Sequence, residues 1–447
     1  MIRILTQKEA SESILKRVPL DDMPVSERLM EGIEAFFGMP LTPEEAVRQI
    51  LREVRADGDQ ALQKWSEKLD GLDTRDFRVD KEDIRKSAEK ITVEERRALQ
   101  ISADRVRRFY ENQPLSSWIM QDGDGTLGQL VRPIERVGLY IPGGTAPLPS
   151  SVIMSAVPAQ VAGVKEIVLV VPPEKGTGKI APITLAAAAL LGIDEIYTLG
   201  GAQAIAAMAF GTETIRRVDK IFGPGNLFVT LAKRQVFGTV GIDGLAGPTE
   251  TMVIADSSAN PEWVAADLLA QAEHDVLASA ILLTSSKKVA EKVKVAVEMQ
   301  MKTLPRADIL SQSLANRSGI VLTADLQESI EIANEYAPEH LCLSVSEPYN
   351  VSEQITAAGG IFVGDYSCEV LGDYVAGPSH VMPTSGTARF ASPLNLLDFV
   401  HLVSLVALNR SEASRLSEPA GIIARAEGLE AHARSADARN DAVGMDQ

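Results

Sequence analysis

From about Val137 onward, short runs of β-branched residues alternate with longer alanine-rich stretches. Strands that alternate with helices build βαβ units, in which helices cover a parallel sheet. The first series predicts strands at residues 136–141, 166–171, 195–199 and 220–222, and helices near residues 150–161, 181–191, 202–209 and 226–234. This alternation restricts the central part of the chain to an α/β fold.

A second series of the same kind follows. It predicts strands at residues 250–255, 278–284, 319–322, 341–345 and 360–363, with helices between them that include residues 261–275 and 287–301. The 447 residues exceed the size that a single hydrophobic core usually serves. We therefore expect two similar doubly wound, incomplete Rossmann-like α/β domains that face a cleft, with small helical extensions at both ends of the chain.

The first 130 residues are charged and show helical periodicity. A helix is expected to begin at Thr42, because this capping residue is followed by Pro43 and by two glutamates near the positive end of the helix dipole. An apolar stripe at helical spacing then follows, made of Val47, Ile50, Leu51 and Val54.

Composition excludes several classes of function. The net charge of −17 and the isoelectric point near 4.9 argue against a nucleic-acid partner, because a negative surface repels phosphates. Cys342 and Cys368 are too few for a disulfide framework and suggest a reducing compartment. No apolar stretch reaches the ~20 residues that span a bilayer, and the first residues lack a signal-peptide core. We expect a cytoplasmic protein without a membrane partner.

Glycine-rich turns follow several predicted strands, at residues 141–144, 199–201, 222–226 and 245–250. In open α/β sheets, ligands bind where such turns line the carboxyl ends of the strands. Glycine lets the backbone approach a phosphate, and helix N-termini favour anions. No GxGxxG fingerprint follows any strand, so a standard dinucleotide site is not indicated. The repetition of these turns, rather than any single one, indicates a ligand site.

The chain has only five histidines, and four lie beside acids, amides or Gly-Pro turns: His274, His340, His380 and His432. Imidazole binds zinc and moves protons near neutral pH. Gln271 and His274 are three residues apart on a predicted helix and would share one face. Two ligands cannot hold zinc tetrahedrally, so a surface hydrogen bond between them stays an alternative.

Two further pairs of residues carry the same kind of chemistry. Asp373 and His432 would complete a metal site, although their spacing does not show it, and an exposed tail histidine is the other interpretation of His432. Glu339 and His340 follow a proline that should end a helix. A neutral imidazole can accept a hydroxyl proton, and an adjacent carboxylate can activate water. The alternative is a capping glutamate beside a partly buried histidine.

Seven segments, in order and spread through nearly the whole chain, closely resemble histidinol dehydrogenase. They are YIPGGTAPLPSS at 140–151, GPGN at 223–226, VFGTVGIDGLAGP at 236–248, QAEH at 271–274, APEHL at 337–341, LGDYVAGP at 371–378 and EGLEAH at 427–432. The motifs are long and unusual. The chain is therefore identified by resemblance as a member of that family.

The resemblance implies a homodimer that oxidises L-histidinol to L-histidine through L-histidinal, in two NAD-dependent steps of histidine biosynthesis. One zinc ion per subunit would be held by Gln271, His274, Asp373 and His432, the last reaching in from the partner subunit. Glu339 and His340 would form the acid–base pair. The NAD site would be lined by Tyr140, Gln203 and Asn226. The substrate would contact the zinc ligands and His340, together with Thr249, His380 and Glu427.

The sequence departs from the residues frequent in that family at Thr249, Ser379 and His401, where serine, asparagine and lysine are common. These departures concern substrate detail rather than chemistry. The alternatives are a family paralogue that oxidises another small polar amino or hydroxy alcohol, a zinc hydrolase that uses Glu339 to activate water, and a non-catalytic binding protein. Glu427 together with His380 favours histidinol, because a carboxylate suits its imidazole or amine.

The domain boundaries expected from these patterns and from the resemblance divide the chain into five parts. They are an N-terminal helical arm at 1–30, the first part of domain 1 at 31–130, the α/β domain on the NAD side at 131–245, the second part of domain 1 with the metal and catalytic residues at 246–392, and a helical tail at 393–447 that is exchanged in the dimer. The tail is too thinly apolar to form its own core.

Overall fold

The computed structural model describes all residues except 1, 19–24, 123–124, 144–145 and 441–447. The chain divides into two compact units. The larger unit consists of Met1–Asn112 and Glu135–Leu396, and the smaller of Gln113–Ile134 and Leu397–Gln447. Among the described residues, no helix combines the length and apolar character needed to cross a membrane.

The larger unit contains a five-stranded parallel sheet with the spatial order β6-β5-β4-β7-β8. Its strands are β4 (Arg136–Tyr140), β5 (Glu166–Val171), β6 (Ile196–Thr198), β7 (Lys220–Phe222) and β8 (Gly241–Ile242). The connecting helices are α6 (Pro149–Val161), α7 (Pro182–Leu190), α8 (Gly201–Phe210) and α9 (Leu227–Val236). Every residue of β4 is buried, as expected for a strand covered on both faces. The predicted α/β fold is confirmed.

A six-stranded parallel sheet in the same unit has the order β1-β11-β10-β9-β12-β13. Its strands are β1 (Ile4–Thr6), β9 (Glu250–Ala255), β10 (Ser279–Thr284), β11 (Gly319–Leu322), β12 (His340–Ser344) and β13 (Gly360–Val363). Its helices are α10 (Pro261–Ala272), α11 (Lys287–Gln300), α12 (Ala307–Asn316), α13 (Leu326–Tyr336) and α14 (Pro348–Ser352). Successive residues alternate between two cores: Val253 and Leu282 lie in one, Met252 and Ile281 in the other.

The N-terminal segment does not form a purely helical arm. Strand β1 extends the edge of the six-stranded sheet by pairing with β11, and the short helix α1 (Gln7–Ser11) follows it. Ile2 is buried in the core of that sheet, which gives the segment an apolar reason to adopt the extended conformation.

Between α1 and the five-stranded sheet, the described residues form the helices α2 (Glu27–Phe37), α3 (Pro43–Asp70), α4 (Lys81–Ser87) and α5 (Val93–Glu111). Helix α3 begins as predicted, because Thr42 and Glu45 form a capping box in which the Glu45 carboxylate accepts from Thr42 N at 2.8 Å. Its apolar stripe shares a core with Ile205 of α8. The packing groups α3 with the five-stranded sheet, whereas the expected boundaries join residues 31–130 to 246–392. Periodicity identifies the buried face of a helix but not the sheet that covers it.

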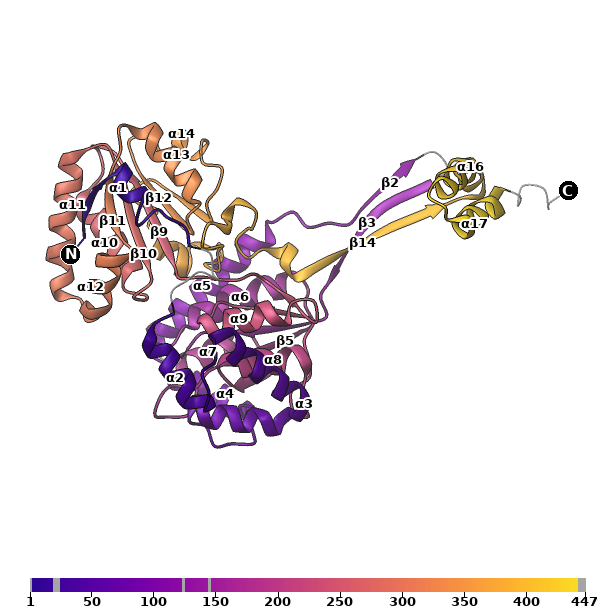
Figure 1. Ribbon diagram of the computed structural model, residues 1–447, viewed down its shortest axis with the longest axis horizontal. Coiled ribbons are helices and arrows are strands. Elements are labelled where there is room, and N and C mark those ends of the chain that lie inside the picture. Colours follow the sequence, from indigo (N-terminus) through magenta and orange to yellow (C-terminus); the bar gives the residue numbers. More distant parts are fainter. Residues whose placement is uncertain (1, 19–24, 123–124, 144–145, 441–447) are drawn as a thin grey trace. The chain divides into compact units, whose positions relative to one another are not determined.

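The smaller unit is a three-stranded antiparallel sheet of order β14-β3-β2 with two helices (Figure 1). Its elements are β2 (Trp118–Asp122), β3 (Gly125–Pro133), β14 (Val400–Leu408), α16 (Arg410–Ala426) and α17 (Glu430–Asn440). The two helices agree with the helical tail expected after residue 393, but residues 400–408 form a strand. Their apolar run finds its partner in β3, which lies far earlier in the chain and cannot be recognised from the tail alone.

Short elements complete the chain. They are the helix α15 (Glu369–Leu371), the π-helical turn η3 (Gly372–Ala376) and the 3-10 turns η2 (Met301–Thr303), η4 (Thr387–Arg389) and η5 (Leu396–Phe399).

A close backbone approach lies at the carboxyl ends of β4 and β7. Gly223 follows β7 with φ +109°, and a Cβ built on it would lie 2.0 Å from Tyr140 O. Its N–H donates to Asp243 Oδ2 at 2.7 Å, and its carbonyl accepts from Lys233 Nζ at 2.9 Å. The buried Lys233–Asp243 ion pair therefore fixes the Gly223 turn from both sides.

We predict that Gly223→Ala lowers the free energy of unfolding more than Gly192→Ala does. Gly192 also has positive φ, +70°, but no atom of the described residues lies within 4 Å of a Cβ built on it. Its substitution should cost about 1 kcal/mol of backbone strain. Gly223→Ala adds a steric conflict and should cost about 2–4 kcal/mol. Urea denaturation followed by circular dichroism measures both, and equal losses would contradict the role given to the Tyr140 carbonyl.

Candidate functional site

Glu339 and His340 lie at the start of β12, directly after the turn that ends α13. Ala337 caps this helix in the left-handed conformation, with φ +51°. Both predicted catalytic side chains are buried, with 7% and 3% of their surface exposed. Glu339 Oε2 accepts hydrogen bonds from Thr249 Oγ1 at 2.6 Å and from Glu250 N at 2.9 Å. The carboxylate is therefore fixed by the residues where β9 begins.

The His340 ring is held at both nitrogens. Its Nδ1 lies 3.3 Å from Glu250 O, and its Nε2 lies 3.1 Å from Asp373 Oδ1. A carbonyl oxygen only accepts, so Nδ1 carries a hydrogen. The ionised Asp373 carboxylate also only accepts, so in the charged ring Nε2 carries a second hydrogen, and this is the proton that can be exchanged. Burial by itself lowers the pKa of His340, but the carboxylates of Glu339 and Asp373 outweigh it and raise that pKa well above its ordinary value.

Asp373 lies in η3, and two other histidines face it. Burial acts to raise its pKa, but the hydrogen bond from His340 and the charges of His340, His380 and His274 outweigh burial, and the pKa of Asp373 is lowered. His380 Nδ1 donates to the Asp373 carbonyl at 2.9 Å, and its Nε2 lies 3.3 Å from Ser151 Oγ at the start of α6. Burial lowers the pKa of His380. His380 therefore links η3 to the helices of the five-stranded sheet.

The Gln271 amide is buried among polar groups near the end of α10. In the orientation that satisfies both of its polar atoms, its nitrogen donates to Glu369 Oε1 at 3.3 Å and its oxygen accepts from Glu250 N at 3.0 Å. Thr249 Oγ1 also contacts this amide. The structure thus brings Gln271 and Thr249 to the same place as the Glu339–His340 pair.

Glu369 is a polar residue of this site that the sequence did not identify. It is 1% exposed, and burial raises the pKa of its carboxyl to about 8. It accepts a hydrogen bond from Thr251 Oγ1 and lies four residues before Asp373. Nothing in its local sequence distinguishes it from an exposed glutamate, because its burial depends on packing against β9.

His274 was expected to continue the helix of Gln271, but α10 ends at Ala272 with Glu273 as its C-cap. His274 is exposed, and its charge nevertheless acts on Asp373. In the described part of the chain, no three His, Cys, Asp or Glu side chains are grouped so as to hold a metal ion. Zinc accepts the donor types of three of the predicted ligands, Gln271, His274 and Asp373. A tetrahedral zinc site has four ligands, so one more would be needed.

His432 and Glu427 belong to the smaller unit and are exposed on it. His432 lies on α17, and Glu427 caps α16. The two units are placed separately, so neither residue is brought to the Asp373 site by the described geometry.

The three residues expected to bind NAD lie at the carboxyl ends of strands in the five-stranded sheet. Tyr140 ends β4, Gln203 lies in the first turn of α8, and Asn226 caps α9 by accepting from Val229 N at 3.2 Å. The Tyr140 hydroxyl accepts from Gly201 N at 3.3 Å. These positions agree with the expected ligand side of this sheet.

Gln203 has an unsatisfied polar atom. Its Nε2 donates to Asp70 Oδ2 at 3.0 Å, whereas its Oε1 is one of the few buried side-chain atoms without a hydrogen-bond partner within the described residues. Such an atom indicates a missing donor. Burial raises the pKa of Asp70, which joins this group from the end of α3.

The residues expected to be catalytic, and Thr249 expected to contact the substrate, do not follow the same rule. Thr249, Glu339 and His340 precede or begin their strands, so they lie at the amino ends of β9 and β12. Glycine-rich turns at the carboxyl ends of strands predict a ligand side for the five-stranded sheet, but they do not point to the amino ends of β9 and β12. In the sequence, Glu339 and His340 are instead predicted from the histidine-containing motifs.

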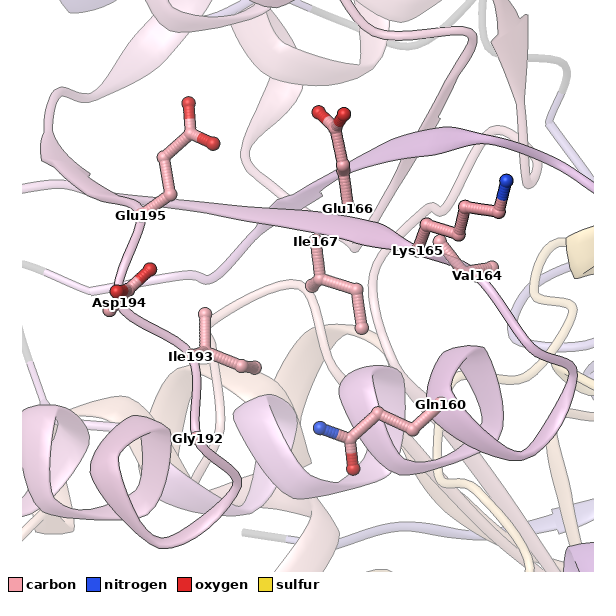
Figure 2. A pocket seen from close by; sticks show the side chains of 9 residues that line it. All are labelled: Gln160, Val164, Lys165, Glu166, Ile167, Gly192, Ile193, Asp194 and Glu195. Carbon is pink, nitrogen blue, oxygen red and sulfur yellow. The ribbon is translucent and has the colours of Figure 1, made fainter.

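Two hollows of the surface lie away from these residues. A cavity of about 290 Å³ lies where β5 and β6 begin, and Figure 2 shows the side chains that line it, including Glu166, Glu195 and Lys165. A second hollow of about 570 Å³ follows one face of α3. Glu166 and Glu195 both pair with the buried Arg136, so they are engaged in the structure of the sheet. The chemistry of the residues, rather than cavity size, locates the site.

Comparisons with known proteins converge on one family. The family model described as histidinol dehydrogenase matches residues 41–440. The histidinol dehydrogenase of Deinococcus radiodurans is 47% identical over 440 residues, which cover 98% of this chain and 100% of that protein. The histidinol dehydrogenase of Thermus thermophilus is 50% identical over 398 residues, covering 89% of this chain and 95% of that protein.

A solved structure gives the same result. The crystal structure of histidinol dehydrogenase from Elizabethkingia anophelis superposes with a TM-score of 0.90 at 36% sequence identity. The superposition covers 99% of this chain and 98% of that one.

We predict that Glu369→Gln stabilises the chelator-treated protein at high pH. The folded-state pKa of about 8 lies above the unfolded value near 4.5, so the folded state retains a proton in between and stability falls as pH rises through this window. The glutamine amide of the variant does not ionise, so the variant does not lose stability as pH rises through this window. The stability difference between variant and parent should be small at pH 5 and on the order of 2–4 kcal/mol at pH 9. Thermal melts across this range measure it, and a constant difference would show that Glu369 is ionised throughout.

Proposed function

Because this chain belongs to the histidinol dehydrogenase family and is an enzyme of it, we propose that it oxidises L-histidinol to L-histidine through L-histidinal. The reaction would proceed in two NAD-linked steps at one site. The observation that carries the proposal is the buried Glu339–His340 pair, held by Thr249 and by the backbone of Glu250. This geometry supports the proposal because it would place a proton acceptor beside a carboxylate able to activate water. A cytoplasmic location is part of the proposal, supported by the small number of cysteines.

We assign the two acid–base roles from the hydrogen bonds. With Nδ1 held by the Glu250 carbonyl, His340 in its neutral form would take the hydroxyl proton of histidinol at Nε2 as hydride leaves the substrate carbon. The neutral form requires that Asp373 no longer holds the Nε2 proton, as when that carboxylate binds zinc. The aldehyde must then gain water before a second hydride can leave. Glu339 Oε2, oriented by Thr249 Oγ1 and Glu250 N, would take a proton from that water. NAD would accept the hydride in each oxidation.

Zinc would be held by Gln271, His274 and Asp373 together with His432 of the partner subunit. The buried Gln271 amide, the lowered pKa of Asp373 and the position of His274 near that carboxylate fit such an ion, because zinc takes amide oxygen, ionised carboxylate and imidazole in its neutral form. When bound, the ion would orient the imidazole and amine of the substrate. Thr249 and His380, together with Glu427 of the partner subunit, would complete the contacts to histidinol.

The NAD site would be formed by Tyr140, Gln203 and Asn226. The unsatisfied Gln203 Oε1 supports this assignment, because a hydroxyl of the nucleotide would supply the missing donor. The nearby Gly201 has φ +60°, a left-handed conformation that glycine adopts without strain, and a Cβ placed there would lie 2.8 Å from Gln203 Oε1.

The homodimer with shared sites is supported by the smaller unit. Its exposed apolar side chains include Leu402 (51%), Val406 (67%), Ile422 (60%) and Ile423 (60%). Apolar surface of this extent on both sheet and helices is typical of a protein interface. A twofold dimer would place Glu427 and His432 of each tail at the site of the other subunit.

The first test of the function is stoichiometry and its dependence on Glu339. The protein with zinc, NAD and L-histidinol should form two NADH per histidine. Glu339→Gln should slow oxidation of added L-histidinal by about 10²–10⁴-fold, because an amide cannot accept the proton of water. Glu335→Gln, an exposed change at the end of α13, is the matched control. A Glu339→Gln enzyme that oxidises histidinal as fast as the parent would refute the assignment.

A second test addresses the sharing of sites. His274→Ala and His432→Ala should each be inactive. If His432 serves the partner, a mixed dimer has one site with both lesions and one with neither. Random reassortment makes about half of the dimers mixed, so co-refolding should restore about a quarter of parental activity. If mixed dimers form and the mixture stays inactive, His432 acts within its own subunit.

A further inference from the structure

Arg17 reaches a buried carboxylate at the start of β9. Its Nη2 donates to Glu250 Oε2 at 3.0 Å, and its Nη1 pairs with Glu250 Oε1. The side chain of Glu250 is 3% exposed, and Ser385 N donates to its Oε1 at 3.3 Å. The pair therefore has the bidentate geometry that a guanidinium forms with a carboxylate and an ammonium cannot.

The same guanidinium holds the end of α13. Its Nε donates to the Tyr336 carbonyl at 3.1 Å, and its Nη2 donates to the Ala337 carbonyl at 3.3 Å. The guanidinium carbon of Arg17, Cζ, lies 3.6 Å from the centre of the Tyr336 ring. These residues form the left-handed turn, φ +51° at Ala337, that leads into Glu339 and His340. Arg17 thus stabilises a turn that alanine adopts only at a cost.

Both contacts of Arg17 converge on the Glu339–His340 pair. The carboxylate of Glu250 binds Arg17, while its N–H donates to Glu339 Oε2 at 2.9 Å and its carbonyl lies 3.3 Å from His340 Nδ1. The guanidinium therefore holds the strand that orients the pair and the turn that carries it. An ion pair that served only to stabilise the fold would need the contact with Glu250 but not the hydrogen bonds to the turn at Ala337.

We propose that Arg17 is a positioning residue that fixes Glu339 and His340 through Glu250 and through the turn at Ala337. In this role Arg17 acts through Glu250 and the turn, and not on the reacting atoms themselves. The inference rests on the proposed role of Glu339 and His340 as the acid–base pair, and it adds to that role a residue more than 300 positions away in the chain. Displacement of a reacting group by about 1 Å can cost on the order of 10²-fold in rate.

The experiment compares Arg17→Ala, Arg17→Lys and the control Arg389→Ala in the holoenzyme. Arg389 is an exposed arginine that donates at 2.8 Å to the carbonyl of Glu335, the residue before Tyr336, and has no contact with Glu250 and no place in the proposed machinery in the described part of the chain. Steady-state kinetics with histidinol and with histidinal give kcat and KM for each variant. Arg17→Ala is also assayed with millimolar guanidinium chloride, with sodium chloride as the salt control, after circular dichroism has shown that it is folded.

We expect Arg17→Ala to lower kcat about 10–100-fold for both substrates while KM changes less than about threefold. Guanidinium, but not sodium chloride, should restore several-fold of the lost rate, because it can occupy the vacated site beside Glu250. Arg17→Lys should show an intermediate loss, and Arg389→Ala should match the parent.

A folded Arg17→Ala enzyme with parental kcat overturns the proposal, and so does a loss of kcat that guanidinium does not restore. If Arg17→Ala does not fold, Arg17→Lys decides: a lowered kcat at parental melting temperature supports the proposal, and a parental kcat overturns it. A parent enzyme that does not oxidise histidinol defeats the proposed function itself, which separates the two failures.

Discussion

The register between β9 and β12 is the constraint on which the candidate site depends. Parallel pairing places His340 opposite Thr251 and Leu341 opposite Met252. This alignment brings the first residues of both strands together, so the Glu250 backbone can hold Glu339 by its N–H and His340 by its carbonyl. A shift of one residue would turn each side chain to the opposite face of the sheet and separate the pair from both groups.

Charge is concentrated in this site at a cost in stability. Glu250, Glu339, His340 and Glu369 are all buried. Each would be costly to ionise without partners, and the hydrogen bonds and opposite charges around them offset that cost. Arg17 compensates Glu250, and the carboxylates of Glu339 and Asp373 compensate His340. At Glu369, the charge of His340 and the hydrogen bond from Thr251 do not outweigh burial, so its carboxyl stays protonated near neutral pH.

Within the larger unit, hydrogen bonds connect helices α5 and α6, next to the five-stranded sheet, to the segment that carries Asp373 and His380. His380 connects η3 to Ser151 of α6, and Ser102 Oγ of α5 donates to the Tyr374 carbonyl at 2.6 Å. The Tyr110 hydroxyl donates to the Leu394 carbonyl at 2.6 Å. The helices that cover the five-stranded sheet therefore also hold the segment that carries Asp373.

Local pattern by itself determined much of this protein. The alternation of strands and helices after residue 137, the start of α3 at Thr42 and its buried stripe follow from periodicity and capping, which depend on neighbouring residues. The motifs around His340 and Asp373 identified the family. The tertiary structure decided what depends on distant residues: the pairing of β14 with β3, the sheet that covers α3, the burial of Glu369 and the contact of Arg17 with Glu250. Each requires two segments far apart in the chain to meet, and no local spacing encodes which segment lies opposite another.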